Sequence, residues 1–217
     1  PCRHPQLGAA DETQKARVGD QYAVRHNPFM YLASVTGSST CARDVVDLSQ
    51  LASDLGSAGA TPALSYITPN LCHDGHDSPC VDGQPGGLAS ADAFLKEWVP
   101  RITGSAAFRK DGLLVITFDE SDGPQSDASA CCGEGPGPNT PAPGITGLGG
   151  GRVGALELSP FTRGCTVSST AYNHYSLLAS LEDVFHQPYL GYAAQPGLNR
   201  FGLDVYNDYS SSSSASP

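Results

Sequence analysis

"DGLLVITFDESDG", residues 111–123, is the stretch that decides the fold class of this chain. Leu113 to Phe118 form a nearly unbroken apolar run, which is typical of a strand buried on both faces of a sheet. The parallel sheets of α/β proteins contain such strands. The run therefore predicts a central strand, and it ends in three acidic residues, Asp119, Glu120 and Asp122.

Segments of helical and extended character alternate around this strand. Apolar residues have helical spacing in three segments: residues 44–59, 88–104 and 171–188. Residues 61–70 and 152–160 are expected to be strands, and residues 21–32 a strand or a shaped loop. Ser90 is the expected N-cap of the second helix, Pro100 its end or kink, and Asn173 or Ser176 lies near the start of the third. This alternation indicates a layered α/β sheet.

Two segments have the composition of irregular chain. Residues 123–151 are dense in glycine and proline, which predicts a long surface loop or lid. The serine-rich tail, residues 207–217, is expected to be disordered or to act as a linker. The preceding residues 1–206 are expected to be the folded part of the chain, whose 217 residues fit one domain, or two small ones, and can bury a sizeable core.

The charge balance restricts the partners. With 12 lysines and arginines against 22 aspartates and glutamates, the formal charge is −10, which argues against binding to nucleic acid or anionic membranes through broad basic patches. No apolar run approaches the roughly 18 residues of a membrane span, and the N-terminus has no signal-peptide pattern. A phosphate-bearing substrate would therefore need local cations, from a metal ion or a few arginines.

The seven cysteines indicate an oxidising compartment. Clustered cysteines in an acidic, Gly/Pro-rich chain favour disulfides, and neither Cys72/Cys80 nor Cys131/Cys132 has the C-x-x-C spacing of a zinc knuckle. We therefore expect a protein that is secreted or lies on the exterior of the cell envelope. Because seven is odd, one cysteine is either free or paired outside this chain.

Polar clusters follow two of the expected strands, where α/β sheets bind their ligands. Asp119 and Glu120 are carboxylates of the kind that divalent cations prefer, although a solvated turn has the same composition. "ITPNLCHDGHDSPC", residues 67–80, combines imidazoles and carboxylates that can bind a metal ion or a phosphate and protonate a leaving group. The alternative is a polar loop closed by a Cys72–Cys80 disulfide, and a disulfide is compatible with both.

Three further side chains are weaker candidates. His174, at the start of a predicted helix, could reach the same end of the sheet, or could simply cap the helix or be exposed. Arg25 can bind an oxyanion through two N–H groups, and His26 is its neighbour, yet most arginines are solvated or paired.

Four motifs occur in a fixed order: "YAVRHNPF" (residues 22–29), "SYITPNLCHDGHD" (65–77), "LLVITFDESDG" (113–123) and "NHYSLLASLEDVF" (173–185). Together they resemble the bacterial phosphoesterase family of secreted acid phosphatases and type C phospholipases. The resemblance extends from about Tyr22 to about Gly191. It implies an alkaline-phosphatase-like α/β/α sandwich that hydrolyses phosphate esters with a bound divalent metal ion.

The resemblance also implies roles for single residues. The metal ligands would be Asp119, Glu120 and Asp74. The catalytic side chains would be His76, Asp77 and His174. The substrate would be bound by Arg25, His26 and Asn70. No role passes to His73, because relatives often have asparagine there.

One part of the family pattern is absent from this sequence. Family members carry a Glu-Asn metal-binding pair and a Ser or Thr nucleophile before the matched region, and residues 1–21 resemble neither. The resemblance thus implies the C-terminal half of a catalytic domain, a partial domain lacking its N-terminal strand and nucleophile segment. That missing segment would be its partner, and the chain alone would be inactive. The predicted activity is that of an acid-phosphatase-like phosphomonoesterase; the alternatives are a type C phospholipase and a non-catalytic secreted binding module.

Overall fold

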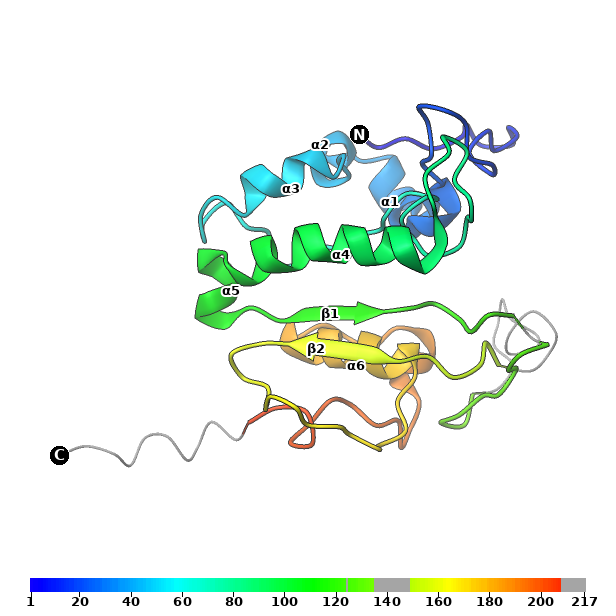
Figure 1. The fold of residues 1–217 in the computed structure, drawn as a ribbon. Coiled ribbons are helices and arrows are strands. Elements are labelled where there is room, and N and C mark those ends of the chain that lie inside the picture. Colours follow the sequence, from blue (N-terminus) through cyan, green and yellow to red (C-terminus); the bar gives the residue numbers. More distant parts are fainter. Residues whose placement is uncertain (124, 135–148, 208–217) are drawn as a thin grey trace. The chain divides into compact units, whose positions relative to one another are not determined.

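A computed structural model describes residues 1–123, 125–134 and 149–207 of the chain (Figure 1). The chain divides into two compact units, residues 1–112 and 113–217, which are described separately below. Most of the predicted tail, residues 208–217, and much of the predicted loop, residue 124 and residues 135–148, lie outside the described residues. No described helix combines the length and the apolar character needed to cross a membrane.

Unit 1 is helical. Its elements are η1 (Val24–His26), η2 (Pro28–Tyr31), α1 (Ala33–Thr36), α2 (Cys41–Asp44), α3 (Ser49–Asp54), α4 (Gly87–Thr103) and α5 (Ala106–Asp111). The helices predicted within residues 44–59 and 88–104 are confirmed as α3 and α4. Residues 21–32 are not a strand: Pro28 opens the second of two consecutive 3₁₀ helices, whose Val24 and Met30 are buried against Cys41.

Helix α4 begins earlier than its predicted N-cap implies, and it continues past Pro100. Its N-cap is Gly86, so the prediction of Ser90 as N-cap is wrong. Ser90 is buried in the first turn, where its hydroxyl accepts a hydrogen bond of 2.9 Å from the Gly86 N–H. Pro100 lies in the last turn and does not end the helix, which continues to Thr103.

Residues 62–69 have no regular secondary structure and do not form a strand in this chain. Among the described residues, none of their backbone N–H or C=O groups makes a backbone hydrogen bond. The side chains of this segment are also open to solvent, since Leu64 is 51% and Tyr66 61% exposed. The prediction of a strand at residues 61–70 was therefore wrong for the described chain, because a strand needs a neighbour with which to pair.

Unit 2 contains the sheet. Strand β1 (Leu114–Thr117) pairs with β2 (Ala155–Leu158), with Leu114 opposite Leu158 and Thr117 opposite Ala155. Both predicted strands are confirmed, but they are antiparallel, as their opposed arrows show in Figure 1. Strand β1 is only half-buried, so the expectation of a strand buried on both faces was wrong. Within the described ranges the sheet has two strands, and this mixture of helix and small sheet is compatible with an α/β fold.

Helix α6 (His174–Val184) confirms the third predicted helix and is the centre of the unit 2 core. Its Ala179 packs with Ala193, in the 3₁₀ helix η3 (Gly191–Ala194), and with Leu198. Asn173 is the N-cap: its side chain accepts a hydrogen bond from the Ser176 N–H, and the Ser176 hydroxyl accepts one from the Asn173 N–H. This capping box fixes where the helix begins.

The side chain of Asp204 is hydrogen-bonded to the segment that precedes α6. Asp204 accepts hydrogen bonds from the hydroxyl groups of Ser168, Thr170 and Tyr172. These donors stabilise the ionised form and lower the pKa of Asp204 to about 2. Burial, together with the bond to Asp204, raises the pKa of Tyr172 to about 12.

Three disulfides confirm the prediction that most cysteines are paired. They join Cys2 to Cys41, Cys72 to Cys80, and Cys131 to its neighbour Cys132. Cys165 is exposed and forms no disulfide, as the odd number of cysteines requires.

Candidate active site

Asn70 shapes the loop that follows residues 62–69 of unit 1. Its Oδ1 accepts a hydrogen bond of 3.1 Å from the Cys72 N–H and lies 2.7 Å from Nδ1 of His73. Its carbonyl accepts hydrogen bonds from the N–H groups of His73 and Asp74. The amide oxygen of Asn70 is therefore used in the turn that presents Asp74.

The loop is held at both ends. Cys72 and Cys80 are buried, and their disulfide closes it. The Gly87 N–H at the start of α4 donates a hydrogen bond of 2.7 Å to the Asp77 carbonyl. Gly86 has φ +67°, and a Cβ there would lie 1.9 Å from the same carbonyl oxygen. Only glycine permits this approach of helix and loop.

Asp74 lies between two histidines. Its Oδ1 accepts a hydrogen bond of 2.9 Å from the His76 N–H, and its Oδ2 lies 3.5 Å from Nδ1 of His26. The Asp74 side chain is 13% exposed, and its buried Oδ2 has no hydrogen-bond partner among the described residues. A buried carboxylate oxygen without a full set of partners attracts a cation or a donor.

His76 faces solvent beside a carboxylate. Its side chain is 82% exposed, and its Nδ1 lies 3.0 Å from Oδ1 of Asp77. The hydrogen bond with Asp77 raises the pKa of His76 above its ordinary value. His76 therefore remains an imidazolium to higher pH than a free histidine, and it can present an N–H to an anion from solvent.

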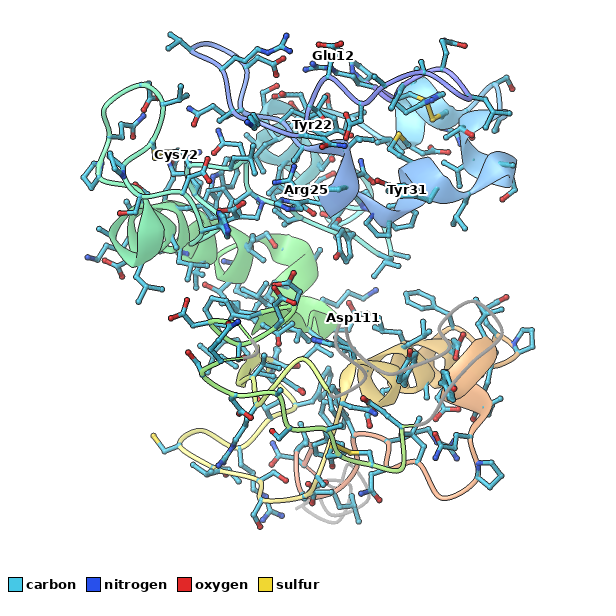
Figure 2. The ribbon with its side chains drawn as sticks, turned by 90° about the vertical axis from the view of Figure 1, so that its right-hand side faces the viewer. Glu12, Tyr22, Arg25, Tyr31, Cys72 and Asp111 are labelled. Carbon is cyan, nitrogen blue, oxygen red and sulfur yellow. A yellow bond between two sulfur atoms is a disulfide. The ribbon has the colours of Figure 1, made fainter. Side chains whose placement is uncertain are left out.

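Arg25 makes its hydrogen bonds to the N-terminal segment of the chain. It lies in η1, where Figure 2 labels it, and His26 is the next residue of the same element. Its guanidinium donates a hydrogen bond of 3.1 Å to the Gln14 carbonyl and approaches the Thr13 carbonyl at 3.5 Å. The structure thus brings together His26, Asp74 and the His76–Asp77 pair, and it bonds Arg25 to the N-terminal segment.

Unit 2 contains the other candidates. Asp119 and Glu120 follow β1, and both are exposed. Neither carboxylate has a hydrogen bond or an ion pair with another described residue. Nε2 of His174 lies 2.8 Å from the Asp119 backbone carbonyl. The first residue of α6 therefore meets the chain directly beyond β1.

The family is evident from comparison with known proteins. A model of the phosphoesterase family matches residues 8–188, most of the chain. The chain belongs to this family. The match includes the loop after residue 70, the acids after β1, and helix α6.

Several curated phosphoesterase relatives are acid phosphatases. The chain is 28% identical to an acid phosphatase of Aspergillus fumigatus over 82% of its length, covering 33% of that protein. It is 27% identical to a phosphate-repressible acid phosphatase of Penicillium chrysogenum over 79% of its length, covering 35% of that protein. A bacterial relative, the phosphatidylinositol-3-phosphatase of Mycobacterium tuberculosis, is 25% identical over 61% of the chain and 33% of that protein. The chain thus spans about a third of the length of these relatives, and no solved structure matches it significantly.

The donor atoms of this phosphoesterase chain suit a hard divalent cation. Asp119 and Glu120 offer open carboxylates in unit 2, and Asp74 offers a buried oxygen in unit 1. Among the described residues, the closest trio of possible ligand atoms belongs to Cys72, Cys80 and Asp82, within 4.8 Å of one another. Because those two sulfurs are bonded to each other, they are not available as thiolate ligands. This trio therefore does not offer a set of metal ligands while the disulfide is intact.

Sequence reasoning missed one residue beside the candidate site. Glu134, in the predicted irregular loop, accepts a hydrogen bond of 2.8 Å from Nδ2 of Asn173, the N-cap of α6. The two residues are 39 apart in the sequence, so no local pattern could have joined them. Asn173, by contrast, was one of the two residues expected near the start of this helix, because it precedes an amphipathic segment.

Proposed function

We propose that this chain is part of a phosphoric ester hydrolase that acts on phosphate monoesters, as an acid phosphatase. The observation that carries the proposal is the His76–Asp77 pair, a solvent-facing imidazole whose pKa is raised, on a disulfide-closed loop. Membership of the phosphoesterase family and the similarity to three fungal acid phosphatases support the same activity.

The proposed ligands, which would hold a divalent cation, are Asp119 and Glu120 in unit 2 and Asp74 in unit 1. When bound, such an ion would polarise a phosphoryl oxygen and lower the pKa of the nucleophile. His76, protonated beside Asp77, donates a hydrogen bond to a phosphoryl oxygen or gives its proton to the leaving alcohol. His174 acts beside Asp119, where its ring already lies.

Substrate binding is proposed for the remaining candidates. Arg25 and His26 would contact the phosphate group, with His26 oriented by the nearby Asp74. Asn70 would contribute through the loop that it shapes, since its amide oxygen is already bonded to the Cys72 N–H.

The nucleophile is proposed to come from outside this chain. The relatives extend over about three times the matched length, which leaves room for a Ser or Thr nucleophile and further metal ligands in an N-terminal segment of the same domain. The attack would form a covalent phospho-enzyme that water then hydrolyses. The disulfides support a secreted or envelope-exterior protein.

The direct test is hydrolysis of an aryl phosphate by the intact protein that contains this chain. Asp119→Ala and His76→Ala are expected to lower kcat about 100-fold or more, as loss of an electrostatic contact to the transition state does in other enzymes. Asp92→Ala is the control, because this exposed aspartate forms a surface ion pair with Lys96. Full activity in either test variant would remove that residue from the site.

Two further measurements separate the alternatives. Release of phosphate from a monoester without release of phosphocholine from a choline phospholipid would exclude the type C phospholipase. Metal analysis tests the non-catalytic binding module: purification without a divalent ion, together with insensitivity to chelators, would favour the module over the enzyme.

A further inference from the structure

Glu134 contacts the residue that starts helix α6. Its Oε1 accepts a hydrogen bond of 2.8 Å from Nδ2 of Asn173, and both side chains are partly buried. Oδ1 of Asn173 accepts a hydrogen bond of 2.9 Å from the Ser176 N–H. An asparagine amide can flip, exchanging its donor and its acceptor. Glu134, which as a carboxylate only accepts, fixes the orientation in which the oxygen caps the helix.

The cap in turn sets the position of His174. This residue is the first of α6 and follows Asn173 directly, so its backbone direction depends on the capping box. Nε2 of His174 lies 2.8 Å from the Asp119 carbonyl, which can only accept a hydrogen bond. The neutral ring must therefore carry its proton on Nε2, which leaves the Nδ1 lone pair available for another partner.

Glu134 is itself anchored on the same core. Cys132, in the adjacent disulfide, packs against the cluster of Ala179, Ala193 and Leu198. Nε2 of Gln195 donates a hydrogen bond of 3.0 Å to the Gly133 carbonyl. The carboxylate of Glu134 is thus presented by a short segment that is fixed on both α6 and η3.

We propose that Glu134 is a positioning residue for His174: through the amide of Asn173, it holds the start of α6 so that the imidazole meets the chain beyond β1 in one tautomer. The proposal rests on the proposed function only for the importance of His174 in hydrolysis. It assigns Glu134 no contact with the substrate.

The first test needs no activity and uses this chain. At a pH where histidines are neutral, nitrogen-15 NMR of the His174 ring should show the Nε2–H tautomer, with the signal assigned by its loss in His174→Asn. Glu134→Ala should give a mixture of tautomers, whereas Glu134→Gln, whose side-chain carbonyl still accepts from Asn173, should restore the single form. An unchanged tautomer in Glu134→Ala, or equal loss in both variants, would overturn the proposal. Glu12→Ala, which alters a glutamate of unit 1, is the control.

Exchanging the donor and the acceptor tests the direction of the hydrogen bond between Asn173 and Glu134. Asn173→Asp keeps a capping oxygen but sets two acceptors against each other, so the ring should lose its single tautomer. Adding Glu134→Gln supplies an N–H donor to the new carboxylate and should restore it. If the double variant behaves like Asn173→Asp alone, the proposed link is wrong.

Hydrolysis by the intact protein separates this proposal from the proposed function. A drop in kcat for Glu134→Ala that Glu134→Gln reverses supports both. If the tautomer changes as expected while kcat and KM stay constant, the positioning role stands, and the catalytic role of His174 falls.

Discussion

Replacement of Gly86 by alanine should separate the start of α4 from the candidate loop of unit 1. The backbone at Gly86 has φ +67°, and a Cβ would lie 1.9 Å from the Asp77 carbonyl oxygen. Either the helix or the loop must move, and the hydrogen bond of 2.7 Å from the Gly87 N–H to that oxygen is then lost or lengthened. We expect a large loss of stability and a displaced Asp77.

A second glycine variant gives a reference that lacks the close approach. Gly83 also has positive φ, at +85°, but its Cβ would meet nothing within 4 Å. Gly83→Ala should therefore cost only the backbone strain, about 1–2 kcal/mol. Gly86→Ala should add about 1–3 kcal/mol for the steric conflict and about 1 kcal/mol for the lost hydrogen bond. The difference between the two variants is then about 2–4 kcal/mol.

The chain's single tryptophan makes the measurement specific to unit 1. Trp98 lies in α4 and is buried, so its fluorescence during urea unfolding reports on the unit that contains both glycines. A second readout is the pKa of His76, measured by NMR, which should fall toward its ordinary value in Gly86→Ala and stay raised in Gly83→Ala. If the two variants unfold within about 0.5 kcal/mol of each other, the approach of α4 to Asp77 does not constrain the loop, and the reasoning is refuted.

Two other predictions concern stability. Replacing both cysteines of Cys2–Cys41 by serine should lower the free energy of unfolding by about 4 kcal/mol, and the same change at Cys72–Cys80 should lower it by about 2.5 kcal/mol. The difference arises because closing the longer loop, with a sequence separation of 39 instead of 8, removes more chain entropy from the unfolded state. Urea unfolding that gave the reverse order would contradict this. Asp204 has its pKa lowered to about 2, so its ionised form stabilises the fold above the unfolded value of about 4, and this contribution is lost as the pH falls from about 4 to about 2. Asp204→Asn should be less stable than the native chain at pH 6, and the gap should close near pH 2 in unfolding followed by circular dichroism.

Local patterns predicted the elements well, and pairing was predicted badly. The apolar run of β1 and the start of α6 near Asn173 or Ser176 are properties of a few adjacent residues, and the presence of both elements was predicted correctly. Which strand pairs with β1, and in which direction, depends on a segment some 40 residues further along the chain, and the sequence could not give it. Residues 62–69 had the composition of a strand, but composition does not supply a partner.

The candidate site shows the same division. Contacts within the loop, such as His76 with Asp77, follow from neighbours in sequence and could be expected from the motif. The meeting of His174 with Asp119 was suggested by the general rule that ligand sites lie at strand ends. The bond from Asn173 to Glu134 depends on how an irregular loop packs, which no periodicity records.

The unpaired segment at residues 62–69 has a consequence for handling the isolated chain. Its backbone makes no backbone hydrogen bond with the described residues, so these groups could pair in an intermolecular ladder, and the exposed Leu64 and Tyr66 add apolar surface to it. Such an edge is a template for aggregation, and Pro62 and Pro69 act as gatekeepers that limit how far a ladder could extend. Concentrated solutions of the chain should therefore oligomerise through this segment, and a lysine in place of Leu64 should keep it monomeric.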